Sequence, residues 1–79
     1  MIEIFPLYRK YPNNKSFFKL LNENEFEEIQ FIGDKGFIFR FKANILPDRY
    51  LIRDMIDLKD KAWVEINSEE YENQRQKLN

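Results

Sequence analysis

The chain has 79 residues with no histidine and no cysteine, and its formal net charge is −1 although 34% of the residues are charged. This length leaves room for one domain, residues 1–79, with a single small core. The composition excludes disulfides, a thiol nucleophile and the nitrogen and sulfur ligands that structural zinc prefers. We therefore expect neither a metal nor a cofactor, and no catalytic residues.

The N-terminal third of the chain alternates short apolar segments with turn residues. Residues 2–8 predict a first strand, in which Pro6 indicates an edge position or a bulge. Residues 11–14 read Tyr-Pro-Asn-Asn and predict a turn. Residues 16–26 are compatible with a strand or with the start of a helix. The pattern favours a strand that ends in a turn at residues 22–24.

The most informative segment is a predicted hairpin formed by residues 28–32 and 37–42, which alternate on either side of the two glycines. Taking Asp34–Gly36 as a three-residue loop places Gly36 in the left-handed conformation that such loops need. A four-residue loop would set polar residues of the first strand opposite phenylalanines, so burial favours the three-residue loop. The predicted facing pairs are Phe31 with Phe39, Ile29 with Phe41, and Glu28 with Lys42.

Residues 35–42 also overlap the pattern of the RNA-recognition motif, which runs basic, glycine, aromatic, small, Phe, Val, any residue, aromatic. Positions 35, 36, 37 and 39 agree with this pattern, and positions 38, 40 and 42 do not. A stacking strand of that kind would expose the phenylalanines and bury Arg40 and Lys42 without partners, which is costly. Alternation therefore favours the opposite orientation, with Phe37, Phe39 and Phe41 inside and the basic residues outside.

Two helices and a short strand are predicted in the second half of the chain. Pro47 is typical of a helix start, and the apolar residues that follow at helical spacing give a helix near residues 48–58. Residues 63–66 predict a short strand. Asn67 precedes Glu70 by three residues, the spacing of a capping box, and so begins a C-terminal helix. The apolar stripe of this last helix is thin, so we expect it to dock lightly.

Together these elements predict an α+β fold. A small antiparallel β-sheet contains the hairpin and the strands near residues 2–8 and 63–66, and the C-terminal α-helix and the second short helix pack against it. The aspartates at positions 48, 54, 57 and 60 lack the spacing of an EF-hand loop, so we expect them to be solvated beside basic residues.

The distribution of charge along the chain predicts one candidate binding surface. Residues 9–19 carry four basic residues and no acid, interleaved with aromatic residues, and the four acids of residues 23–28 follow without a base. Such segments neutralise one another if they pair across the sheet, and otherwise form patches of opposite sign. Tyrosine and arginine are frequent anchors of interfaces. The candidate interaction surface consists of Tyr8, Arg9, Lys10, Tyr11, Lys15 and Lys19.

The function class that fits best is a non-enzymatic protein-binding module: a regulator, an inhibitor or an accessory subunit with a protein partner. The chain lacks the usual catalytic residues, and it has eight Phe, four Tyr and one Trp, more rings than a small core accommodates. A phage- or mobile-element-encoded inhibitor of a host protein machine fits the size and composition. A homodimer would be another way to cover surplus apolar surface.

The alternative is a single-stranded nucleic-acid-binding protein. Its basic and aromatic surface would consist of Tyr8, Arg9, Lys10, Tyr11, Lys35 and Arg40. The nearly neutral net charge argues against this alternative, because binding to the phosphate backbone needs a basic excess. No apolar run approaches the length that spans a bilayer, and the N-terminus lacks the pattern of a signal peptide. We therefore expect a cytoplasmic bacterial or phage protein that has no membrane partner.

Overall fold

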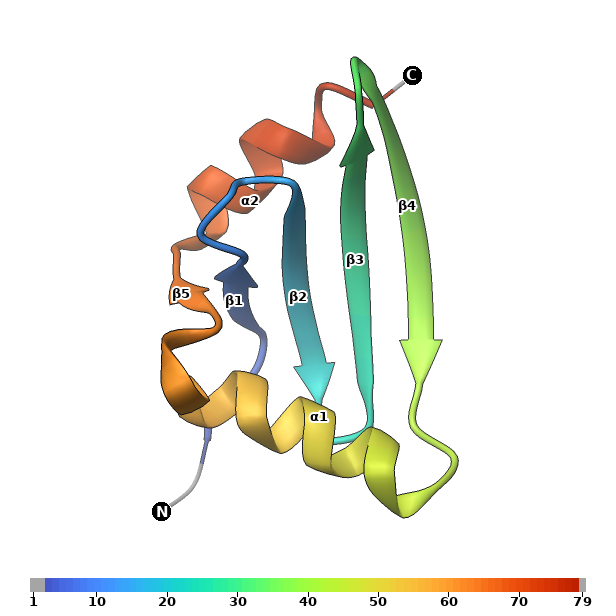
Figure 1. Ribbon diagram of the computed structural model, residues 1–79, viewed down its shortest axis with the longest axis vertical. Coiled ribbons are helices and arrows are strands. Elements are labelled where there is room, and N and C mark those ends of the chain that lie inside the picture. The colour runs from blue at the N-terminus through green and yellow to red at the C-terminus, as the bar shows by residue number, and fades with distance from the viewer. Residues whose placement is uncertain (1–2, 79) are drawn as a thin grey trace.

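The computed structural model describes residues 3–78 and shows a five-stranded antiparallel sheet in the order β4-β3-β2-β1-β5 (Figure 1). The strands are β1 (Leu7–Lys10), β2 (Ser16–Asn22), β3 (Glu25–Ile32), β4 (Lys35–Lys42) and β5 (Val64–Glu65). The helices are α1 (Leu46–Asp57) and α2 (Ser68–Arg75), with a 3-10 turn, η1 (Lys59–Lys61), after α1. The predicted α+β class is confirmed. Within residues 3–78, neither helix is long and apolar enough to cross a membrane.

The two helices lie on opposite faces of the sheet, and each covers its own hydrophobic core. In Figure 1, α1 crosses the lower end of the sheet in front, and α2 lies behind its upper end. The core under α1 contains Phe18, Leu20, Phe26, Ala43, Ile52 and Met55. The core under α2 contains Phe17, Ile29 and Tyr71. A sheet with both faces covered buries consecutive residues of a central strand, which explains why Phe17 and Phe18 are both apolar.

The first strand lies further along the chain than predicted. Residues 3–6 of the predicted segment precede β1, and residues 1–2 lie outside the described part of the chain. Pro6 has no N–H group to donate to a sheet ladder, so pairing begins only at Leu7. The other strand predictions hold more closely. Residues 16–22 form a strand as favoured, and β5 falls within the predicted residues 63–66.

The β3–β4 hairpin has a two-residue turn, Gly33–Asp34, so the predicted three-residue loop is wrong. Gly33 has a φ of 63°, the positive value that the first central residue of a type II′ turn requires. Gly36 lies inside β4 and is not the left-handed residue. The observed facing pairs are Phe31 with Gly36, Ile29 with Ile38, Glu28 with Phe39, Phe26 with Phe41, and Glu25 with Lys42.

The predicted helices are both confirmed, but the C-terminal one docks more firmly than expected. The side chain of Asn67 accepts a hydrogen bond from the backbone N–H of Glu70 at 2.8 Å, as the capping-box spacing predicts. Tyr71, at the middle of α2, has no exposed surface and packs against Tyr8 with ring centroids 5.4 Å apart. A single well-anchored aromatic residue thus replaces the wide apolar stripe that this helix lacks.

Gly36 is required for space and not for backbone conformation. A Cβ atom at this position would lie 2.9 Å from the Phe31 ring and would overlap a methyl group of Leu78. We expect Gly36→Ala to lower the free energy of unfolding by about 1–2 kcal/mol, the usual cost of overpacking. Urea denaturation followed by circular dichroism measures this change. Equal stability of Gly36→Ala and the wild type would show that α2 and the chain after it do not pack on β4.

Candidate interaction surface

The structure distributes the six residues of the predicted interaction surface over both faces of the sheet. Tyr8 and Lys10 lie on the face that α2 covers. The Tyr8 ring contacts Tyr71, and Lys10 Nζ forms an ion pair with the Glu70 carboxylate at 3.0 Å. Lys19 pairs with Tyr8 across the strands and is half-buried on this same face. Tyr8 and Lys10 therefore contribute to the packing of α2 more than to an open surface.

Arg9 is buried, with 4% of its surface exposed, which corrects its placement on a binding surface. Its Nε donates a hydrogen bond to the Met55 carbonyl at 2.8 Å, and its Nη2 donates to the Ile56 carbonyl at 3.1 Å. These carbonyls belong to the last turn of α1, which contains no basic residue of its own. Burial lowers the pKa of Arg9 from its usual value, but an arginine stays cationic at any physiological pH. Arg9 thus neutralises the C-terminus of α1.

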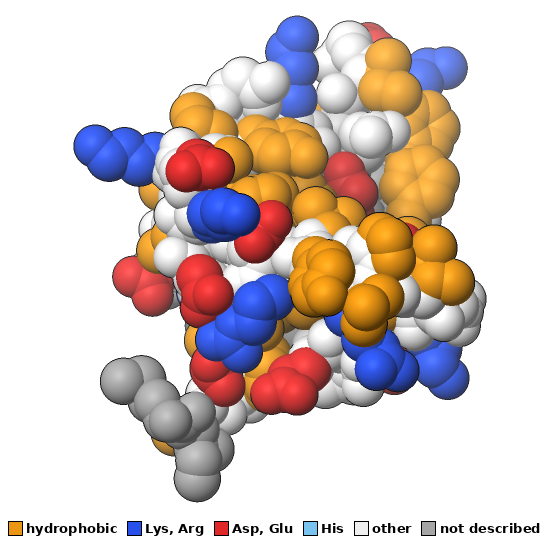
Figure 2. All heavy atoms as spheres, turned by 60° about the horizontal axis from the view of Figure 1, so that its bottom comes forward, with side chains coloured by type: hydrophobic (Ala, Val, Ile, Leu, Met, Phe, Trp, Pro, Cys, Tyr) orange, Lys and Arg blue, Asp and Glu red, His pale blue; other side chains and the backbone are white. Residues whose placement is uncertain are grey.

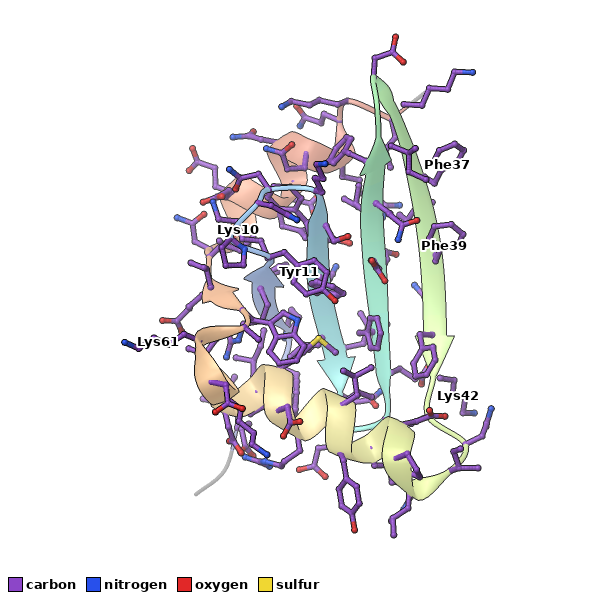
Figure 3. All side chains as sticks on the ribbon, viewed as in Figure 1. Lys10, Tyr11, Phe37, Phe39, Lys42 and Lys61 are labelled. Atoms are coloured by element: carbon purple, nitrogen blue, oxygen red, sulfur yellow. The ribbon has the colours of Figure 1, made fainter. Side chains whose placement is uncertain are left out.

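Tyr11 and Lys15 complete the predicted set and lie near the turn between β1 and β2. Tyr11 is 36% exposed on the α1 side of the sheet, where its ring stacks on Trp63 with centroids 6.2 Å apart. Figure 3 shows it in front of β2, whereas Lys10 lies further up, toward α2. Lys15 is exposed in the turn. The structure therefore does not bring the six residues together into one patch.

A different surface is both exposed and apolar. It runs along β4 and over the beginning of α1, and Figure 2 shows hydrophobic side chains gathered there along the right side of the view. We call it the β4–α1 surface. It comprises Phe37 and Phe39 of β4 together with Ile45, Leu46, Tyr50 and Leu51 at the start of α1, each between 38% and 60% exposed. Contiguous apolar surface of this kind on a small protein indicates a binding site.

The exposure of Phe37 and Phe39 corrects the prediction that all three phenylalanines of β4 lie inside. Only Phe41 packs against the core, where its ring stacks on Phe26 with centroids 4.9 Å apart. All three side chains point to the face that α1 covers. However, α1 crosses only the end of the sheet near Lys42, away from Phe37 and Phe39 (Figure 3). Phe37 and Phe39 therefore stay 43% and 51% exposed at the other end of the strand.

The residues at the start of α1 were also missed, although the sequence carries a signal for them. Ile52 and Met55 form the buried side of the helix, with at most 1% of their surface exposed. Leu46 and Tyr50 are spaced four residues apart and therefore share a second side of the same helix. They are 57% and 60% exposed. A helix with apolar residues on more than one side has either a second core or an interface to cover.

The charges beside this surface are basic. Lys35, Arg40 and Lys42 all belong to β4, and no acidic residue occurs from residue 35 to residue 47. Arg40 Nη2 lies 3.5 Å from the Glu27 carboxylate, yet the Arg40 side chain is 63% exposed. Within residues 3–78, no ion pair holds Lys35 or Lys42. The edge strand β4 therefore carries apolar and basic side chains, and the acids next to it, Glu25, Glu27 and Glu28, belong to β3.

Shallow depressions also lie on the described part of the surface. One, of about 570 Å³, lies between α2 and the tip of the hairpin, with Lys10, Glu70 and Lys77 among its lining residues. The other, of about 440 Å³, runs beside α1 past Leu46, Tyr50 and Arg53 and adjoins the β4–α1 surface. In the part of the chain that the structure describes, no three potential metal ligands cluster together. Of the four predicted aspartates, two lie beside cations: Asp57 pairs with Arg53 at 2.9 Å, and Asp54 with Lys59 at 4.0 Å.

No protein-family model, curated protein or solved structure matches this chain. The function of this small α+β fold must therefore be argued from its surface.

Proposed function

We propose that this protein is a non-enzymatic protein-binding module that acts as a regulator, an inhibitor or an accessory subunit. The observation that carries the proposal is the β4–α1 surface, which exposes aromatic and large aliphatic side chains on a protein of this size. Aromatic and large apolar residues that lose water on association are typical centres of protein interfaces. Basic residues lie on the same strand: Lys35 shares the face of Phe37 and Phe39, and Arg40 and Lys42 lie on the other face of β4.

Binding of single-stranded nucleic acid is a second candidate, favoured by the exposed rings of Phe37 and Phe39 beside basic residues. Three features weigh against it. Glu28 lies directly opposite Phe39 on the same face and would set a carboxylate beside a stacked base. Arg9 is buried, and Lys10 is already paired with Glu70. Two of the cations that the nucleic-acid surface would need are therefore engaged within the protein.

The test is a tagged pull-down from host lysate, run with and without nuclease and at low and high salt. We expect a stoichiometric protein partner that survives nuclease and high salt and that Phe39→Ser no longer retains, with binding reduced about tenfold or more. Phe39 is half exposed, so this change should alter the free energy of unfolding by less than about 1 kcal/mol. Lys77→Ser, beside α2 and near the tip of the hairpin, is the control outside the β4–α1 surface and should retain the partner.

Two results would contradict the proposal. Retention that disappears on nuclease treatment would favour the nucleic-acid candidate. A stable protein partner that Phe39→Ser and a Tyr50→Ser variant both retain at full affinity would show that binding occurs elsewhere on the molecule.

A further inference from the structure

We propose that β4 binds its partner by strand addition, in which an extended segment of another protein, alternating acidic and apolar residues, continues the sheet beside β4. This inference rests on the proposed function and specifies the mode of binding and the chemistry of the partner. It follows from the backbone of β4, from the side chains on its two faces, and from the charge that these side chains carry.

The backbone of β4 presents a row of hydrogen-bonding groups to the open edge of the sheet. The Ala43 N–H donates to the Asn24 carbonyl at 2.7 Å, toward β3, and the Phe31 N–H donates away from β4, to the Lys15 carbonyl at 2.8 Å. In an antiparallel ladder, alternate residues direct both backbone groups to the same side. The odd-numbered residues of β4 therefore bond to β3. The residues whose backbone groups point outward are Gly36, Ile38, Arg40 and Lys42.

β4 is long enough for another strand to pair along its open edge. β4 has eight residues and stands at one end of the sheet (Figure 1). The opposite edge strand, β5, has only two residues, and short edge strands give little support to an added strand. Long unpaired edges are the sites where extended peptides add to a sheet, with backbone hydrogen bonds supplying affinity and alternate side chains supplying specificity.

The two faces of β4 define the side chains that an added strand must carry. On the α1 face, its residues would lie beside Phe37 and Phe39, where aromatic or β-branched side chains pair well. On the α2 face, they would lie beside Ile38, Arg40 and Lys42, and the two cations favour acidic side chains there. Because side chains alternate along a strand, the matching segment alternates apolar and acidic residues.

The same charges disfavour a second copy of this chain as the occupant. Antiparallel pairing of two β4 strands centred on Phe39 would align their phenylalanines on one face. On the other face, Arg40 of each copy would lie opposite Ile38 and diagonal to Arg40 of the other copy, within reach of its like charge, which is destabilising. Basic residues on an edge strand are a known protection against self-pairing. An acidic strand meets no such repulsion.

The direct test uses a synthetic peptide as long as β4 (8 residues), capped at both ends, in which glutamates alternate with valine and phenylalanine. Binding is followed by amide NMR and hydrogen exchange on the intact protein. We expect shifts and slower exchange at the outward amides of β4, and affinity that falls as salt rises. The same peptide with lysine in place of each glutamate should bind about tenfold more weakly or not at all. Methylation of its alternate backbone nitrogens should abolish binding.

Ile38→Pro and Ile38→Ala separate the backbone from the side chain. Both substitutions shorten the apolar side chain, but only proline also removes the outward backbone N–H of residue 38. This N–H does not bond to β3, so its removal costs the sheet no hydrogen bond. We expect Ile38→Ala to retain the acidic peptide within a few-fold and Ile38→Pro to lose it. Circular dichroism confirms that each variant is folded. If Ile38→Pro does not fold, Lys42→Glu provides the test, because it should reverse the preference between the acidic and basic peptides.

The outcomes distinguish this inference from the proposed function. Equal binding of the acidic and basic peptides, shifts confined to α1, or equal affinity of Ile38→Pro and Ile38→Ala would each overturn strand addition. If the cellular partner is lost by Phe39→Ser but retained by Ile38→Pro, the protein-binding function stands and strand addition fails. Concentration-dependent dimerisation that Ile38→Pro removes would identify a second copy as the occupant and overturn the acidic partner.

Discussion

Replacing Arg9 with methionine is expected to lower the free energy of unfolding by about 3 kcal/mol, a large part of the stability of so short a chain. Methionine keeps the apolar stem and removes the guanidinium, so the change measures the hydrogen bonds and the charge. The Ile56 carbonyl would lose the donor that now reaches it at 3.1 Å, and the Met55 carbonyl would lose its 2.8 Å bond and keep only the 3.4 Å bond from the Leu58 N–H. Buried carbonyls left without a donor carry the full cost of their lost hydration.

The guanidinium of Arg9 has a geometry that no other side chain supplies. Its third donor, Nη1, bonds to the Tyr8 carbonyl at 2.8 Å, while Nε and Nη2 span two successive carbonyls of α1. The carboxylate of Glu65 is 3.9 Å away and 71% exposed, so the helix end more than this ion pair holds the charge. Arg9→Lys should therefore recover only part of the loss, because an ammonium cannot span these carbonyls.

Urea denaturation at neutral pH measures these free energies. Arg49→Met is the matched control, because Arg49 is an exposed arginine in the first turn of α1, and its replacement should change the free energy by less than about 0.5 kcal/mol. Two results would refute the role assigned to Arg9: an unfolding curve for Arg9→Met that overlays the wild type, or full recovery by Arg9→Lys.

Most elements of this fold follow from local patterns that can be read directly from the sequence. Asn67 caps α2 because its side chain can reach the N–H of Glu70, and that requirement depends only on their spacing. The helix from Leu46 to Asp57 likewise follows from Pro47 and from apolar residues at helical spacing. Such local signals hold because tertiary packing here agrees with them.

The register of the β3–β4 hairpin could not be derived in the same way. The prediction placed Ile29 and Phe31 on the same face as the phenylalanines of β4, on the assumption that one face of the sheet is buried. In the structure, Ile29 lies under α2, and Phe26 lies under α1 with Phe41. Where helices cover both faces, burial no longer selects one register, and the turn decides it. Gly33 and not Gly36 takes the positive φ.

The candidate site was less accessible to sequence reasoning than the fold. Arg9 and Phe39 each lie in an environment opposite to the one that its residue type predicts. The arginine is buried, and the phenylalanine is half exposed. Both environments depend on where α1 crosses the sheet. The C-terminus of α1 needs a cation, which Arg9 supplies, and α1 is too short to cover the far end of β4. That crossing is a tertiary property, and no local pattern around residue 9 or residue 39 encodes it.

Removing the charge of Glu27 is expected to weaken the attachment of α2 to the sheet. Glu27 is 7% exposed, and its Oε1 accepts hydrogen bonds from the Tyr71 hydroxyl at 2.8 Å and from Arg75 at 2.6 Å. Burial alone would raise the pKa of the Glu27 carboxyl, but the hydrogen bonds from Tyr71 and Arg75 outweigh it and hold the pKa below its usual 4.5. We expect Glu27→Gln to lower the free energy of unfolding by about 2–3 kcal/mol at neutral pH.

The pH dependence of this loss identifies its cause. A carboxyl whose pKa is depressed on folding contributes its full stabilisation above the pKa of the unfolded chain, near 4.5, and loses it as the pH falls through the lower folded value. The difference between wild type and Glu27→Gln should therefore shrink toward zero in acid, as urea titrations at successive pH values would show. Glu28→Gln, on the same strand but the opposite face, should differ little from wild type at any pH. If the Glu27→Gln difference stays constant into acid, the carboxylate contributes through its shape and not its charge, and Tyr71 and Arg75 hold α2 without it.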